Sequence, residues 1–435
     1  MAVKRVDSSH SGDTSTSRGG VLIQLNLIGL LVFSAALVVA SVLVTRGMLA
    51  DRSVADLKPA SVPSVEMTAP GNSSRVRDES NPPAWGQLFT ANIELEQPEE
   101  YLGYELATNR VETWTFEGMT PGDVRSLLQS SGLAAGEINR ALSPPLLTRA
   151  DSNTVVVPDA RLVFALTPET RAKVYAVLGH SRSNRLMQSP FILVGSSADT
   201  RFAGSGLSEP VLNSLRNLFY PRGRSECFSD LEIMLQQLPT EKERWLLLKA
   251  LSRQSAVLAR LHVWPDTDID KLIGYWGRGV QAKDLRPLLE SLTRIPGGAS
   301  ISLLYFLPQF ARQRLYTYPE PSQPNDPVMD CHWSTLNFFN EVPDNRFSDP
   351  AYAILYLQNN CYKIAQPGAY GDMIFLLDQH GSAIHSAVYL ADDLVFTKNG
   401  NNFAQPWMLM HLDDLVAKYT TDTAPQLAVY RNKNW

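Results

Sequence analysis

An uncharged, strongly apolar run from Val21 to Thr45 is the feature that most constrains this chain. A helix rises about 1.5 Å per residue, so the run is long enough to cross a hydrocarbon layer of roughly 30 Å. The apolar core of a cleaved signal peptide is shorter, about 7–15 residues, and here a polar tail of residues 1–20 precedes the run. We therefore predict a transmembrane anchor, with a cleaved signal peptide as the alternative.

Basic residues flank the apolar run on both sides, so they do not decide its orientation, and a long following domain translocates largely regardless of them. We expect residues 1–20 to form a short cytoplasmic tail and the bulk of the chain to lie across the membrane. Residues 46–98 are rich in Ser, Pro, Val and Asn without sustained periodicity, which predicts a flexible linker.

The composition excludes several classes of protein. The formal net charge is −5, which argues against a nucleic-acid-binding protein because phosphate neutralisation needs a basic surface. The three cysteines include no Cys-x-x-Cys pair, so neither a disulfide scaffold nor a zinc-thiolate site is expected. We predict no cofactor and no metal site.

The region 99–200 is predicted to be a small α+β module. Thr120-Pro121 and Thr167-Pro168 each combine an N-cap residue with proline at the first helical position, which predicts two helices. Between them, Thr154–Val157 and Leu162–Leu166 are predicted strands. Nothing in the module indicates a chemical role.

Residues 205–318 are predicted to be all-α, because apolar residues recur at roughly helical spacing from Leu247 to Leu261 and in the segments that follow. Pro308 is expected to kink the last of these helices. The run Asp266-x-Asp268-x-Asp270 resembles a calcium-binding loop but lacks its sixth-position Gly and twelfth-position Glu. We predict instead that these acids cap a helix that begins near Lys271.

The proline-dense stretch 319–327 predicts a domain boundary, and the chemistry is concentrated after it. Asp330 precedes a predicted helix, which places Cys331 in the first turn, where the helix dipole favours a thiolate. A further predicted helix covers 349–359. Strands are predicted over 371–377, from His385 onward, over 394–397 and over 426–430.

This order resembles the NlpC/P60 and CHAP branch of papain-like cysteine hydrolases. The matching pieces are Asp330-Cys331, the strand sequence GDMIFL and the sequence HSAVYLADDLVF that His385 opens, with 385 − 331 = 54 residues between Cys and His. Trp333 resembles the Cys-x-Trp variant of CHAP proteins. The resemblance covers about a quarter of the chain, from Asp330 to Tyr430.

The resemblance implies Cys331 as nucleophile and His385 as its base. The residue that orients the histidine is expected at 385 + 12 = 397, where this chain has Thr397, and nearby Asn399 is the alternative. The small residues that usually follow the cysteine are replaced by His332 and Trp333, which would crowd the cleft or change its specificity.

The expected architecture is therefore multidomain: a cytoplasmic tail (1–20), a transmembrane helix (21–45), a linker (46–98), an α+β module (99–200), an all-α region (205–318) and an α+β papain-like domain (322–435). The resemblance implies an exported hydrolase on the bacterial inner membrane, with its catalytic domain on the periplasmic side, cleaving peptidoglycan stem peptides. One alternative is a catalytically inactive papain-like scaffold whose helical region docks a protein partner. The other is a protease or acyl transferase that acts on a protein.

Overall fold

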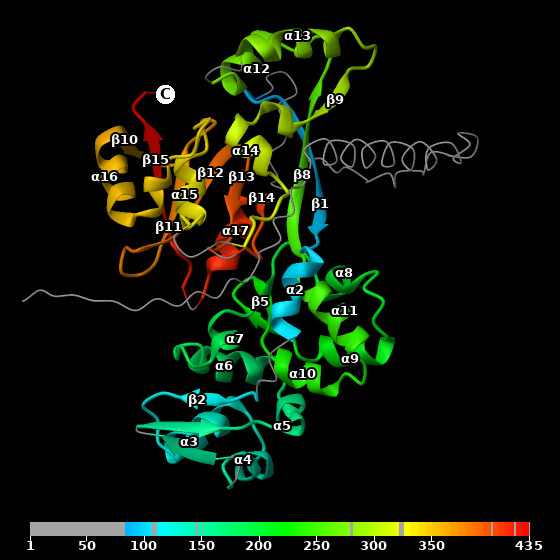
Figure 1. Cartoon of the computed structure of the whole chain (residues 1–435), viewed down its shortest axis with the longest axis vertical. Helices are drawn as coiled ribbons and strands as arrows, with labels where there is room; N and C mark the ends of the chain where they lie inside the picture. Colours follow the sequence, from blue (N-terminus) through cyan, green and yellow to red (C-terminus); the bar gives the residue numbers. More distant parts are fainter. Residues whose placement is uncertain are drawn as a thin grey trace, which may run out of the picture. The chain divides into compact units, whose positions relative to one another are not determined.

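The computed structural model describes residues 83–106, 111–144, 147–150, 152–278, 282–321, 326–401, 403–421 and 423–434. The predicted tail, the transmembrane helix and most of the linker lie outside these ranges. Within the described ranges, no helix combines the length and apolar character that crossing a membrane requires. The described chain has a mixed α+β fold with several antiparallel sheets (Figure 1).

The first described strand, β1 (Gln87–Leu95), lies within the predicted linker, so that prediction was wrong for these residues. It pairs antiparallel along its whole length with β8 (Gln254–Val263), and β9 (Ala299–Ser302) extends the sheet on the other side of β8. The strand was not predicted because the Ser- and Pro-rich composition of residues 46–98 as a whole indicated a linker.

Because β8 is a strand, the prediction of an all-α region over 205–318 was wrong as well. The helix α11 (Glu241–Ser252) ends before β8 begins. Within β8, Ala259, Leu261 and Val263 are buried and alternate with more exposed residues, the period of two that a strand requires. Over so short an apolar run helical and strand spacings both fit, and pairing with a distant strand decides between them.

In the predicted module, α3 (Pro121–Ser131) and α6 (Pro168–Leu178) confirm both helix predictions, with Thr120 and Thr167 as N-caps. The strand β4 (Asn153–Val156) is also confirmed; it lies between β2 (Trp114–Phe116) and β3 (Leu147–Ala150). The predicted strand Leu162–Leu166 was wrong: it is covered by the helix α5 (Ala160–Ala165), because the Asp159 carboxylate accepts the N–H of Leu162 and caps a helix there.

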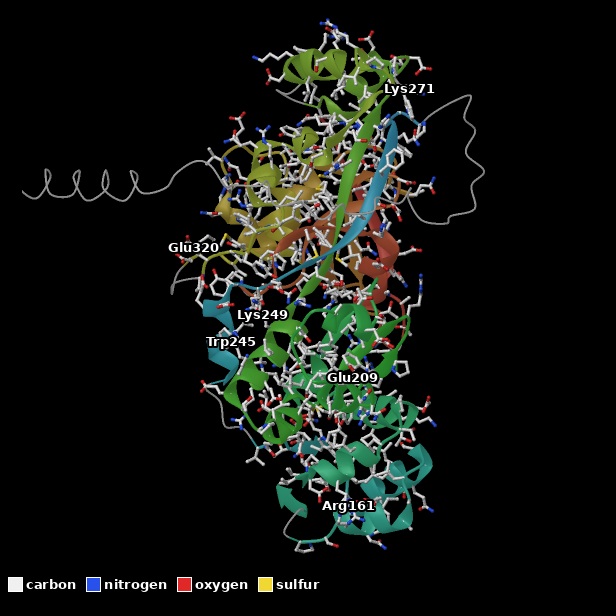
Figure 2. The ribbon with its side chains drawn as sticks, turned by 90° about the vertical axis from the view of Figure 1, so that its right-hand side faces the viewer. Arg161, Glu209, Trp245, Lys249, Lys271 and Glu320 are labelled. Atoms are coloured by element: carbon white, nitrogen blue, oxygen red, sulfur yellow. The ribbon has the colours of Figure 1, made fainter. Side chains whose placement is uncertain are left out.

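One cluster of buried apolar side chains runs from Trp114 to Leu251, across the expected boundary at residues 200–205. Besides the sheet of β2, β4 and β3, this region contains a three-stranded sheet in the order β5-β7-β6 and further helices. They are α2 (Glu99–Leu106), α4 (Ala135–Ala141), α7 (Arg185–Gln188), β5 (Phe191–Leu193), α8 (Ala198–Phe202), α9 (Glu209–Arg216), β6 (Tyr220–Arg222), β7 (Ser225–Phe228) and α10 (Leu231–Gln237). Lys249 of α11 binds Glu96 and Glu99, each at 3.2 Å, and so ties α11 to the start of α2 (Figure 2).

The helix after the aspartate run begins as predicted. It is α12 (Ile269–Trp276), and the Asp268 carboxylate accepts the N–H of Lys271 at 3.0 Å as its N-cap. The helix α13 (Ala282–Thr293) follows. The expected kink at Pro308 was wrong: a 3-10 turn, η1 (Leu303–Phe306), ends before Pro308, which is the N-cap residue of a separate helix, α14 (Gln309–Arg314).

The C-terminal part contains a six-stranded antiparallel sheet in the order β10-β15-β11-β12-β13-β14 (Figure 1). Its strands are β10 (Cys361–Ile364), β11 (Met373–Leu377), β12 (Ala383–Ala391), β13 (Leu394–Lys398), β14 (Trp407–His411) and β15 (Gln426–Asn432). The helices are α15 (Cys331–Leu336), η2 (Asn345–Ser348), α16 (Pro350–Asn360) and α17 (Leu412–Tyr419). The predicted helices at 331 and 349–359 and the strands at 371–377, 385, 394–397 and 426–430 are confirmed; β10, β14 and α17 were not predicted.

This sheet has two buried faces, and each packs against a different helix. Phe396 and Trp407 point to the face on which α15 packs. Val395 and Met410 point to the opposite face, where Leu415 of α17 is buried. Side chains alternate along β13, so Phe396 faces α15 and Val395 faces α17; along β12 the alternation is interrupted, because Leu390 and Ala391 both belong to the α15 face.

Candidate active site

Cys331 is the first residue of α15, and the Asp330 carboxylate accepts the N–H of Trp333 at 2.8 Å as the N-cap. The backbone N–H groups of Cys331, His332 and Ser386 favour the thiolate, as expected at a helix N-terminus. Burial acts the other way and is the larger effect: Cys331 is 6% exposed, and burial together with the Asp330 carboxylate raises the pKa of the thiol to about 12. The expected lowering of this pKa is therefore not found in this structure.

His385 is fully buried on β12 and is held at one ring nitrogen. Its Nε2 lies 2.7 Å from Oγ1 of Thr397 on β13, and that hydroxyl donates a long bond of 3.4 Å to the Ser386 carbonyl. The direction of the Nε2–Oγ1 hydrogen bond depends on the ring tautomer; in the tautomer with the hydrogen on Nε2, the ring donates to Thr397 and Nδ1 keeps a lone pair. Nδ1 is buried and has no hydrogen-bond partner among the described residues.

The pairing between β12 and β13 ends before it reaches His385 and Thr397. The ladder between these strands runs from Ala391↔Leu394 to Val388↔Phe396 and goes no further. Beyond Val388 and Phe396, the Thr397 hydroxyl donates to the Ser386 carbonyl. The Ser386 N–H faces the Cys331 sulfur.

His385 and Thr397 belong to the face covered by α17, whereas Cys331 comes from α15 on the other face. Cys331 and His385 do not hydrogen-bond each other in the described structure. The structure thus brings His385 and Thr397 together, and it brings Cys331 to the residue that follows His385 in the chain.

The surroundings of His385 favour the neutral form of its ring. Tyr419, the last residue of α17, stacks on it with ring centroids 4.2 Å apart and an interplanar angle of 20°. Burial lowers the pKa of His385 well below its usual 6.5, and the nearby His332 and Lys418 side chains act in the same direction.

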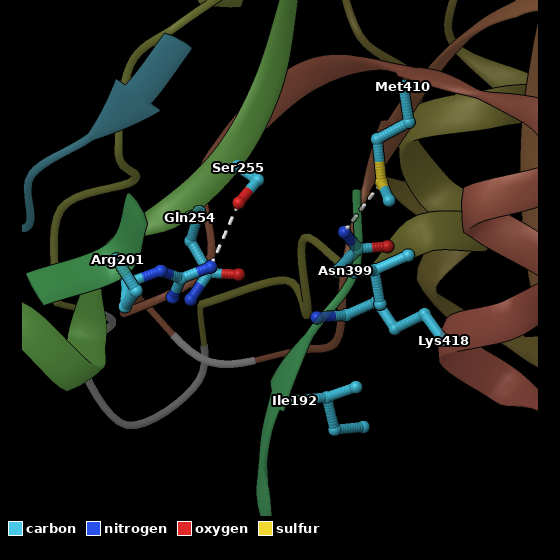
Figure 3. Close-up of a pocket in the computed structure, with 8 residues that line it drawn as sticks. Ile192, Arg201, Gln254, Ser255, Asn399, Met410 and Lys418 are labelled. Carbon is cyan, nitrogen blue, oxygen red and sulfur yellow. Dashed lines mark hydrogen bonds between the residues drawn. The ribbon is translucent and has the colours of Figure 1, made fainter. Parts of the chain in front are cut away.

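Asn399, the alternative orienting residue, does not contact His385. Its Nδ2 donates to Sδ of Met410 at 3.2 Å (Figure 3), and its Oδ1 has no hydrogen-bond partner among the described residues. Asn399 and Lys418 line a shallow pocket that also includes Arg201 and Gln254. Of the two candidates, the one that holds the histidine is Thr397.

Sequence reasoning missed two residues at this site, Tyr419 and Lys398. Lys398 is fully buried on the α15 face of β13, and its Nζ donates to the Gly400 carbonyl at 2.9 Å. Burial lowers its pKa to about 8, against the attraction of Cys331 and Asp330. A lysine at the end of the apolar strand LVFTK was a visible signal. Tyr419 gave none, because the helix that carries it was not predicted.

The neighbouring His332 has a separate environment. Its Nδ1 lies 3.0 Å from Oγ of Ser386, and its ring stacks on Phe375 at 5.8 Å. The Ser386 hydroxyl donates in turn to Oγ1 of Thr335 at 3.0 Å. These contacts leave His332 directed toward the sheet on the α15 face.

Comparisons with known proteins give no relative. No protein-family model matches the chain, and no curated protein or solved structure matches it. Within the described ranges, no group of three or more His, Cys, Asp and Glu side chains is placed to hold a metal ion.

Proposed function

We propose that this chain is a membrane-anchored, exported cysteine hydrolase that cleaves an amide bond in peptidoglycan stem peptides. The single observation that carries the proposal is the state of His385. One ring nitrogen is hydrogen-bonded to Thr397, and the other is buried and has no partner among the described residues, while the next residue, Ser386, presents its N–H to the Cys331 sulfur. A buried polar atom without a partner is costly, and such an atom supports a role for His385 Nδ1 as a proton acceptor or a ligand contact.

The order of elements supports the papain-like assignment. A helix that begins with cysteine (α15), a strand led by Gly-Asp (β11), a strand with histidine (β12) and a strand with a polar residue twelve positions on (β13) follow one another. The NlpC/P60 and CHAP resemblance rests on this same order, and peptidoglycan as substrate rests on that resemblance.

The chemistry follows from the groups in place. His385 Nδ1 takes the proton of the Cys331 thiol, and the thiolate attacks the amide carbonyl carbon. The N–H groups of Cys331 and His332 at the start of α15 donate to the oxyanion that forms. His385 returns the proton to the leaving amine, and water then hydrolyses the thioester. Catalytic hydrogen bonds are often long or poorly aligned before substrate binds, and this scheme requires the bond between Cys331 and His385 to form at that step.

Location belongs to the same proposal. The apolar run 21–45, which lies outside the described residues, supports an anchor in the bacterial inner membrane. The tether that follows it is shorter than residues 46–98, because β1 already begins at Gln87. The hydrolase would then act on the periplasmic side, close to the membrane surface.

A second candidate function is the non-catalytic scaffold with a protein partner. It is favoured by the burial of Cys331 and His385, which holds both side chains uncharged in this structure. A protease or acyl transferase acting on a protein uses the same residues and differs only in its substrate.

The test is digestion of purified peptidoglycan by the full chain in mild detergent, with products identified by mass spectrometry. Wild type is compared with Cys331→Ala and with Cys361→Ala, a matched control because Cys361 is equally buried at the start of β10. We expect stem-peptide fragments from wild type and the control and none from Cys331→Ala. Equal cleavage by Cys331→Ala would exclude the mechanism. Cleavage of a denatured protein alone would favour the protease, and no cleavage of either substrate would favour the scaffold.

A further inference from the structure

A shallow pocket lies where β5, α8 and the start of β8 meet β14, α17 and the residue that follows β13 (Figure 3). Its polar lining residues are Arg201, Gln254, Ser255, Asn399 and Lys418. Two of them carry a positive charge, and none of the residues that line the pocket is acidic. The lining therefore brings two cations together without a carboxylate between them.

The ammonium group of Lys418 has no counter-ion among the described residues. Lys418 lines the pocket from the last turn of α17, and its side chain is half-buried. It forms no hydrogen bond and no ion pair with any residue that the structure describes. Asp414, one turn earlier on α17, lines a neighbouring pocket beside Asn92 instead. A charge that is partly removed from water without a partner costs free energy, which a bound anion would offset.

Arg201, the other cation of the pocket, already has a carboxylate partner. Its Nε lies 3.2 Å from Oε2 of Glu94, and Oε1 of the same carboxylate accepts the Ser255 hydroxyl at 2.7 Å. Arg201 is 2% exposed, and its Nη2 donates to Oγ of Ser255 at 2.9 Å (Figure 3). These contacts fix the guanidinium group at the wall of the pocket and use the Glu94 carboxylate fully, which leaves Lys418 unpaired.

A third cation belongs to the same surroundings. Arg222 ends β6, and its buried Nε has no hydrogen-bond partner among the described residues. Arg222 pairs with Ser225, whose hydroxyl donates at 3.2 Å to the carbonyl of Ala417, the residue before Lys418. Burial lowers the pKa of Lys418 to about 8, and the charges of Arg201 and Arg222 act in the same direction. An anion in the pocket would relieve this repulsion.

We infer that the pocket binds one small oxyanion, the phosphate or carboxylate group of a ligand, and that the Lys418 ammonium holds it. Such a group supplies the negative charge that the lining lacks, and its oxygens accept hydrogen bonds from an ammonium donor. Because the two sides of the pocket come from segments far apart in the chain, a bound anion would also join them. The inference is independent of the proposed hydrolase, since neither Cys331 nor His385 lines the pocket.

The experiment measures anion binding by the full chain in mild detergent. Equilibrium dialysis at pH 7 against radiolabelled inorganic phosphate, in chloride buffer of constant ionic strength, gives the number of sites and the Kd. A parallel series uses radiolabelled acetate as the carboxylate probe. Wild type is compared with Lys418→Met, which keeps the length of the side chain without its charge. The matched control is Lys363→Met, because Lys363 is an exposed lysine on β10 of the same sheet.

We expect wild type and Lys363→Met to bind one anion per chain with the same Kd. Lys418→Met should bind at least tenfold more weakly, because it lacks the charged donor. The probe that binds more tightly identifies the group as phosphate or carboxylate. Thermal melts in chloride buffer check the fold, and Lys418→Met should melt no lower than wild type because it loses only an unpaired charge. If it melts lower, Lys418→Gln, which keeps a polar end, replaces it, with the same weakening expected.

Equal Kd values for wild type and a folded Lys418 variant would overturn the inference, since the anion would then bind elsewhere. So would wild type that fails to saturate with either probe up to about 50 mM. A rise in melting temperature with the bound probe in wild type, absent from the Lys418 variant, would support the site by a second measurement, because a ligand that binds only the folded chain stabilises it.

Discussion

Both Nε and Nη2 of Arg431 reach the buried carboxylate of Asp372, each at 2.7 Å, and this pair fastens the last strand to the loop before β11. The same carboxylate accepts the N–H groups of Gly368 and Ala369. Burial by itself would raise the pKa of Asp372, but Arg431 and these two N–H groups outweigh it and hold the pKa below its usual value. The Gly-Asp pair that suggested a family resemblance is thus a structural anchor here.

Replacing Arg431 by Met should therefore destabilise the protein by about 2 kcal/mol or more, because it leaves a buried carboxylate without its cation. The control is Arg346→Met, since Arg346 binds Asp344 at the same 2.7 Å on an exposed surface, where solvent screens the pair, and its loss should cost much less. Urea denaturation at pH 7 measures both. Equal losses in the two variants would contradict this account.

The Arg431–Asp372 contribution should also depend on pH. The folded pKa of Asp372 lies below its ordinary value of 3.8, so the stabilisation is present above that value and is lost as the pH falls through the folded pKa. The difference in free energy of unfolding between wild type and Arg431→Met should therefore shrink below about pH 4. A difference that stays constant down to pH 2.5 would show that the charge of Asp372 is not what Arg431 stabilises.

Thr397 should matter to catalysis and Asn399 should not. Thr397→Val keeps the shape but removes the hydroxyl that holds His385 Nε2, so we expect cleavage to slow about 10- to 100-fold. Thr397→Ser retains the hydroxyl and should restore most of the rate. Asn399→Leu, whose side chain contacts methionine sulfur, should change the rate less than about threefold. The reverse ranking, measured as peptidoglycan cleavage rates, would assign the orienting role to Asn399.

The sequence predicted the C-terminal elements well because their signals are local. Asp330 and Asp349 cap helices, and short apolar runs bounded by turn residues mark β11, β12 and β13. The same holds for Thr120, Thr167 and Asp268 earlier in the chain. Caps act within a single turn, so they are visible without any knowledge of the fold.

What could not be predicted depends on partners distant in the chain. The strand β8 has an apolar spacing that also fits a helix, and its pairing with β1, more than 150 residues earlier, decides the matter. The burial of Cys331 is a tertiary effect too: the backbone N–H groups around the sulfur lower the thiol pKa, but packing against the sheet raises it by more, so the expected low pKa is not found. Similarly, nothing local indicates that Tyr419 returns to cover His385.

The buried state of His385 should make stability fall in mild acid. Its folded pKa lies well below 6.5, so the unfolded chain binds a proton that the folded chain refuses, and stability decreases as the pH falls below about 6.5. The slope for one such group approaches about 1.4 kcal/mol per pH unit. His385→Gln, which is neutral throughout, should flatten the decline between pH 6.5 and 5.

The control for this measurement is His411→Gln. Asp393 raises the pKa of His411, so that residue stabilises the protein below pH 6.5 and loses its contribution as the pH rises through the folded pKa. Its removal should steepen the acid decline rather than flatten it. Identical pH profiles for both variants, from thermal melts, would rule out the opposite assignments of the two histidines.

Glu112 should destabilise the protein at neutral and alkaline pH. It is buried near Asp230 and Glu232, and burial, with the repulsion of those carboxylates, raises its pKa to about 8. Because the ordinary value is 4.5, the folded chain holds a proton that the unfolded chain releases between these two values, and stability falls as the pH rises across that window.

Glu112→Gln mimics the protonated form and should raise the free energy of unfolding by about 2 kcal/mol at pH 8, with little change at pH 4.5. The matched control is Glu117→Gln at an exposed position, which should be neutral at both values. A Glu112→Gln variant that is no more stable than wild type at pH 8 would mean that the carboxylate is ionised and accommodated in the folded protein.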